Sequence, residues 1–158
     1  EYEKKGGNFE FAFAWGGIFS NKILNLSKNS SKVIYHGLVS SEKAGLISSE
    51  YEWALLPIED KITRYAFPSK LSSYILSDAK ILAICGKDTS VAEWIKQKNV
   101  GIVVDPNVSE IVKIFFKIQN NKINLDFPGI KNKELKKNLS METFLKKIEN
   151  ELTKLQNE

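Results

Sequence analysis

The chain has 158 residues and a formal charge of +4, with 42% hydrophobic and 27% charged residues. This length suits a single domain, and this composition is typical of a folded globular protein rather than a disordered chain. No apolar run reaches the roughly 18 residues that a membrane-spanning helix needs. The single arginine argues against a nucleic-acid surface, so we expect no nucleic-acid partner.

The number of cysteines indicates the cellular compartment of the protein, and the distribution of lysines raises the question of a membrane contact. Cys85 is the only cysteine, so it cannot form an internal disulfide, and we expect a reducing, cytoplasmic location. Much of the lysine lies between Lys113 and Lys154. These lysines predict either a solvated tail, which is the simpler interpretation, or a weak peripheral contact with the anionic inner face of the membrane.

Short apolar runs alternate along the chain with segments of helical period. β-Branched and aromatic residues predict strands at residues 9–14, 32–36, 51–56, 80–84 and 100–104. Helices are expected at 18–28, from Ser40 or Ser41 through Ile47, after Pro68, after 88–90, and from Ser109 through Ile118. A lysine- and glutamate-rich helix or helix pair is expected to close the chain.

Strands that are each followed by a helix, with loops of a few residues, predict a Rossmann-like α/β fold. We expect one doubly wound parallel sheet of about five to six strands in a single domain covering residues 1–158. Residues 1–5, followed by Gly6 and Gly7, resemble the last turn of a helix with its glycine C-cap. We therefore expect a fragment of a longer protein that lacks a strand and a helix upstream.

The predicted sheet also indicates where a ligand would bind. Ligands of open parallel sheets bind beyond the carboxyl ends of the strands. Four segments are expected at that edge, namely residues 15–17, 37–39, 59–70 and 86–90. Helix N-termini attract anions, and Arg64, Lys70 and Lys87 add positive charge there. An anionic ligand is therefore the expected class.

Five segments in this order resemble the C-terminal domain of GT-B glycosyltransferases, and more narrowly bacterial enzymes that assemble surface polysaccharides. They are residues 32–39 (KVIYHGLV), 53–57 (WALLP), 65–76 (YAFPSKLSSYIL), 81–84 with Glu93 in the following helix, and 100–105 (VGIVVD). The likeness covers about residues 9–118. It implies the donor-binding half of a two-domain enzyme. The absent N-terminal domain would hold the acceptor and the catalytic base.

The resemblance also implies the site residues. The donor's diphosphate would contact Ser69, Lys70 and the backbone near Phe67, and the nucleotide base would contact Gly37, Leu38 and Val39. Ser73 stands where the family usually has an acidic residue that holds the ribose hydroxyls. Arg64 and Glu93 complete the candidate donor site, the first through its charge and the second through a contact with the donor sugar.

The implied function is transfer of a sugar from a nucleotide diphosphate donor to a glycan or lipid-linked acceptor, with no cofactor and no metal. The isolated domain is expected to be inactive, because the acceptor half is absent. Ser73 leaves open a second class, a degenerate, non-catalytic binding module. Other doubly wound proteins, receiver-like or epimerase-like, are a third option. His36, Cys85 and the three tryptophans, Trp15, Trp53 and Trp94, are interpreted as structural residues.

Overall fold

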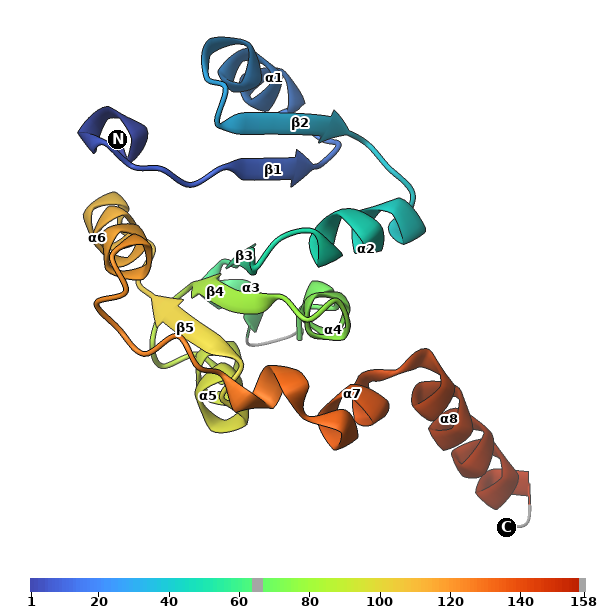
Figure 1. The fold of residues 1–158 in the computed structure, drawn as a ribbon. Helices are drawn as coiled ribbons and strands as arrows, with labels where there is room; N and C mark the ends of the chain where they lie inside the picture. Colours follow the sequence, from blue (N-terminus) through green and yellow to red (C-terminus); the bar gives the residue numbers. More distant parts are fainter. Residues whose placement is uncertain (64–66, 157–158) are drawn as a thin grey trace.

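The structure is a computed structural model that describes residues 1–63 and 67–156. Strands alternate with helices over most of this length, which confirms the α/β class (Figure 1). The strands are β1 (Phe11–Ala14), β2 (Val33–Gly37), β3 (Trp53–Pro57), β4 (Lys80–Ile84) and β5 (Gly101–Val104). Each begins and ends within two residues of its predicted bounds.

The helices follow the same alternation. Between the strands lie α1 (Ser20–Asn29), α2 (Ser41–Ser49), α3 (Asp60–Thr63), α4 (Lys70–Leu76) and α5 (Ser90–Lys98), and after β5 come α6 (Val108–Gln119), α7 (Lys133–Leu139) and α8 (Met141–Gln156). Single 3-10 turns occur at Glu3–Lys5 and Pro128–Lys131. Within the described residues, no helix is both long enough and apolar enough to cross a membrane.

The strands form two parallel sheets, one of β1 and β2 and one in the order β3-β4-β5. The prediction of a single sheet of five to six strands is therefore wrong. β1 and β3 are not paired by backbone hydrogen bonds, so the ladder is interrupted between them. Figure 1 shows β1 on the side of β2 that faces β3.

The main core lies around the three-stranded sheet. Ile81, Leu82 and Ala83 of β4 are at most 1% exposed, which is typical of the central strand of a parallel sheet. On one face β4 packs against α4 and α5 through residues that include Leu71 and Ile95. On the other face it packs against α6. Helices thus cover both faces of this sheet.

An aromatic cluster joins the N-terminal sheet to α6. The Phe115 ring of α6 lies 5.2 Å from the Tyr2 ring and 5.4 Å from the Phe11 ring, measured between centroids. Just before β1 and β3, the Tyr51 hydroxyl donates a 3.1 Å hydrogen bond to Glu10. The two sheets are therefore held beside each other by side chains and by α6, without a shared backbone ladder.

Candidate functional site

Three loops meet near the carboxyl ends of β1, β2 and β3, and Trp15 lies among them. It directly follows β1, and the Tyr35 hydroxyl of β2 donates a 2.9 Å hydrogen bond to its carbonyl oxygen. The Lys70 ammonium, at the start of α4, lies 4.9 Å from the centroid of the Trp15 ring. A cation is attracted to the face of an indole ring. Lys70 and Trp15 thus link the first loop to the helix predicted to hold phosphate.

The loop after β2 adds an exposed apolar side chain to this edge. Gly37 has φ +71°, a left-handed conformation that glycine adopts without strain. The turn leaves Leu38 85% exposed, with its side chain against Gly16, where an added Cβ would lie 3.0 Å from a Leu38 methyl carbon. Val39 follows, partly buried. The structure therefore brings the loop at residues 37–39 beside the loop that carries Trp15.

The other site residues predicted around α4 differ in their contacts. Ser69 and Lys70 are exposed, and the Ser69 hydroxyl makes no capping hydrogen bond to α4. Ser73 is exposed one turn further along α4. Phe67 is 47% exposed and its ring packs edge-on against Trp94 of α5, 5.3 Å between centroids. Arg64 lies outside the described residues.

Glu93 belongs to the exposed surface of α5. It accepts a 3.1 Å hydrogen bond from Gln97 one turn later. It lines an open depression of about 420 Å³ with Lys87, Asp88, Lys96 and Gln97, all from α5 or the loop before it. Its contacts are those of a carboxylate in the first turn of a helix, where the helix dipole stabilises it.

The loop after β4, which was predicted to attract an anion, already holds a carboxylate. The Gly86 amide donates a 2.7 Å hydrogen bond to Asp60 Oδ1. Thr89 donates to the Gly86 carbonyl oxygen and accepts from the Ala92 amide, so it caps α5. An incoming anion would have to displace Asp60 and would be repelled by its charge. Sequence reasoning missed Asp60, which lies 26 residues from Gly86.

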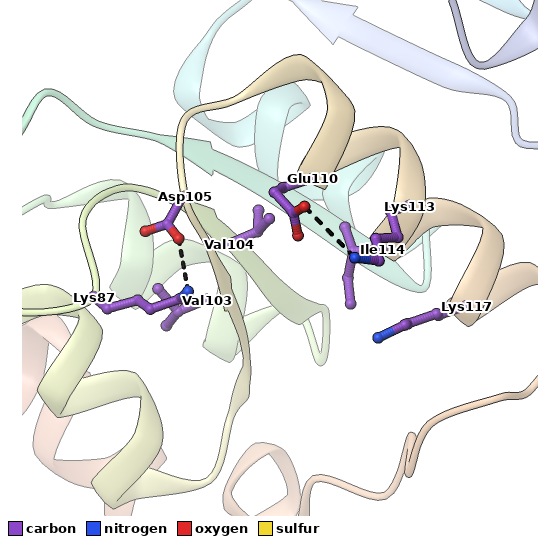
Figure 2. Close-up of a pocket in the computed structure, with 8 residues that line it drawn as sticks. All are labelled: Lys87, Val103, Val104, Asp105, Glu110, Lys113, Ile114 and Lys117. Atoms are coloured by element: carbon purple, nitrogen blue, oxygen red, sulfur yellow. Dashed lines mark ion pairs between the residues drawn. The ribbon is translucent and has the colours of Figure 1, made fainter.

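Lys87 is also engaged. Its ammonium lies 2.7 Å from Asp105 Oδ2, and this hydrogen bond raises the pKa of Lys87. The pair lies in a pocket of about 170 Å³ beside α6, where Glu110 and Lys113 form a second ion pair, 3.6 Å between charged atoms (Figure 2). Lys117 is a third lysine in this pocket, beside the two that are paired with carboxylates. An anion would compete with Asp105 and Glu110 for the paired lysines, which makes this pocket a weaker candidate for an anion site.

Comparison with known proteins adds no relative. No protein-family model matches the chain, and neither a curated protein nor a solved structure matches it significantly. Among the residues that the structure describes, no group of three histidine, cysteine, aspartate or glutamate side chains could hold a metal ion.

The site residue that sequence reasoning interpreted otherwise is Trp15. It was expected to be packed, but it is 39% exposed and contacts Lys70. Trp53 and Trp94 are packed as expected, against Phe127 and Phe67 respectively. The signal that distinguishes Trp15 is its place in the chain, since it is the first residue after a strand and precedes two glycines.

Proposed function

We propose that this chain binds a nucleotide diphosphate sugar as the donor-binding half of a glycosyltransferase in surface polysaccharide or glycan synthesis. The observation that carries the proposal is the Lys70 ammonium, 4.9 Å above the exposed Trp15 ring near the carboxyl ends of the strands. A lysine ammonium suits the diphosphate, and an aromatic face suits a base or a sugar ring.

Lys70 is a better phosphate ligand than the other lysine predicted at this edge. Lys87 is paired with Asp105, so a phosphate would compete with a carboxylate for it. Lys70 instead contacts a neutral ring, which leaves its N–H groups able to donate to phosphate oxygens. Leu38 extends the apolar surface beside Trp15 through its contact with Gly16. The three loops thus offer one cation next to apolar surface.

The acceptor is part of the proposal but not of this site. A glycan or lipid-linked acceptor, and the catalytic base, would bind on another domain facing the carboxyl edge. Residues 1–158 alone should then bind donor without transferring sugar, because the groups that align the acceptor are absent. The proposal also places the protein in the cytoplasm.

We further infer that an added strand between β1 and β3 would join the two separate sheets in a longer protein. In the common order 3-2-1-4-5-6, the first strand lies between the second and the fourth. If β1 to β5 are the second to sixth strands, the unpaired edges of β1 and β3 would flank that first strand. Such a strand would explain why β1 and β2 form one ladder and β3 to β5 another.

Calorimetric titration of residues 1–158 with uridine, guanosine and thymidine diphosphates tests the proposal. Inorganic pyrophosphate serves as a fourth titrant that carries the phosphates without a base. We expect one nucleotide to bind clearly more tightly than pyrophosphate, because its base adds contacts at the apolar surface. Equal binding of all four would reduce the site to a general anion site, and binding of none would exclude donor binding.

A second candidate, a non-catalytic binding module, is favoured by Ser73 alone. Its exposed hydroxyl lies on α4 where the resemblance implies a carboxylate for the ribose. A serine makes a weaker hydrogen bond to a hydroxyl than an ionised carboxylate does. On this candidate the chain would keep the fold and the partner surfaces but bind no nucleotide.

A further inference from the structure

The longest helix of the described chain, α8, carries an uncovered apolar stripe. In Figure 1 it extends away from the sheets and follows α7. Five side chains spaced four and three residues apart are each between 40% and 69% exposed, namely Met141, Leu145, Ile148, Leu152 and Leu155. We call these five residues the α8 seam. Phe144, 56% exposed, lies beside them.

The spacing of the α8 seam is that of a helix that packs against another helix. Alternating steps of three and four residues keep apolar side chains on one narrow face, as in a coiled coil. Contiguous exposed apolar surface of this kind marks an interaction site in soluble proteins. The seam therefore needs a partner surface of the same shape, which an amphipathic helix provides.

The charges beside the seam determine which helix fits. At 100° per residue, Glu142, Glu149 and Glu151 lie about 80–100° from the centre of the seam. The three lysines of this helix, Lys146, Lys147 and Lys154, lie about 120–140° away, on its back. Glu142 pairs with Lys146 and Glu151 with Lys154 across these positions. The flanks that would meet a partner are therefore acidic.

This charge pattern disfavours two other occupants. An anionic membrane surface attracts helices with excess basic charge, whereas α8 has three lysines and three glutamates. Among the described side chains, a second copy of α8 would offer Glu142, Glu149, Phe144 and Glu151 at the flanking positions, so a self-pair gains no opposite charge across the seam.

We propose that the α8 seam binds an amphipathic helix whose apolar stripe has lysines or arginines on both sides. The partner's basic flanks would face Glu142 and Glu149 on one side of the seam and Glu151 on the other. This docking site is separate from the proposed donor site and does not depend on it.

The test uses two synthetic peptides of about three heptads with the same leucine and isoleucine seam. One carries lysine at its flanking positions and the other carries glutamate. Fluorescence anisotropy of labelled peptide, titrated with residues 1–158, should show about tenfold tighter binding of the lysine peptide at low salt. Raising the salt should shrink this difference, since exposed charges are screened.

Charge-reversal variants connect this preference to the named residues. The triple variant Glu142→Lys, Glu149→Lys, Glu151→Lys should bind the glutamate peptide more tightly than the lysine peptide. The control changes the exposed residues Glu50, Glu59 and Glu134 to lysine, which alters net charge equally and should keep the original preference. A control that reverses the preference would assign it to net charge and overturn the proposal.

Removal of the apolar stripe supplies the second arm. Ile148→Ser with Leu152→Ser should abolish binding of both peptides, while circular dichroism shows a folded protein, because both residues are exposed. The proposal is overturned if the lysine peptide fails to bind the unaltered chain, or binds this variant equally well. It is also overturned if the chain dimerises through α8 in light scattering, or if anionic vesicles bind α8 and exclude the peptide.

Discussion

At the scale of single residues, the positions of charged side chains around the carboxyl edge decide which lysine can bind an anion. The sequence offers several cations and helix N-termini there, and only the family resemblance favours Lys70 among them. The structure separates two of them, because Lys87 pairs with Asp105 while Lys70 lies over Trp15. The Gly86 amide donates to Asp60, so a phosphate would have to displace this carboxylate from the loop after β4.

Ser73 gives a gain-of-function prediction. If the ribose of a bound nucleotide lies over α4, then Ser73→Glu supplies a carboxylate that accepts hydrogen bonds from ribose hydroxyls. Such charge-assisted bonds contribute about 1.5–3 kcal/mol, so nucleoside diphosphate binding should strengthen about tenfold or more in calorimetry. The gain should vanish with a 2′,3′-dideoxy nucleotide. Equal gains for both nucleotides would place the ribose elsewhere.

Cys85 gives a prediction of reactivity and pH dependence. Its side chain is fully buried, and burial raises the pKa of the thiol. Ellman's reagent should leave the native protein unmodified near pH 8 and label it once urea unfolds it. A raised pKa in the folded state stabilises the protein below the pKa of the unfolded thiol, and that contribution is lost as the pH rises through the folded pKa. Rapid labelling of native protein would contradict the burial.

At the scale of elements, the sequence predicted most of the fold because the strands are local apolar runs. Residues 80–84 were expected to form a strand, and they form β4, where Ile81 to Ala83 are buried. Pairing between strands is not local, however. Whether β1 meets β3 depends on what lies between them, and no period in either segment encodes it. That is why the single-sheet prediction failed while the individual strands were confirmed.

The candidate site shows the same division between local and distant information. Loops at residues 15–17 and 37–39 were predicted to share an edge because each follows a parallel strand, and the Leu38–Gly16 contact bears this out. The ion pair and the amide hydrogen bond that occupy the loop after β4 join residues far apart in sequence. Lys87 meets Asp105, and Gly86 meets Asp60. Only tertiary structure places them.

A pair of glycine substitutions tests the packing of β4 against β5. A Cβ at Gly101 would overlap the backbone carbonyl of Ile81, whereas a Cβ at Gly45 in α2 meets nothing within 4 Å. Gly101→Ala should therefore lower the free energy of unfolding by about 1–3 kcal/mol. Gly45→Ala should raise it by about 0.5–1 kcal/mol, through helix propensity. Urea denaturation measures both, and an unchanged Gly101→Ala would contradict the β4–β5 register.

At the scale of the whole molecule, both sheets pack against the same helix, α6, but no backbone ladder joins them. α6 packs against β4 and against the aromatic residues near β1 within one apolar cluster. The C-terminal helix α8 exposes the apolar side chains of its seam. In our proposals, a further strand lies at the unpaired edges of β1 and β3 and a partner helix binds the α8 seam.

The most direct test of the donor-binding account is the effect of Lys70→Ala on nucleoside diphosphate affinity. Removing a charged partner of a bound anion costs about 1.5–3 kcal/mol, so the dissociation constant should rise about ten- to a hundredfold. The matched control is Lys28→Ala, which removes the same charge from the last turn of α1. Because helices run back from the carboxyl edge, Lys28 lies toward the opposite edge of the sheet.

Calorimetry on both variants, with thermal melts to confirm folding, gives the comparison. The account predicts weaker binding for Lys70→Ala and unchanged binding for Lys28→Ala, with melting temperatures close to that of the unaltered chain, because exposed lysines contribute little to folding. Equal affinity of Lys70→Ala and the unaltered chain for the same nucleotide would contradict it.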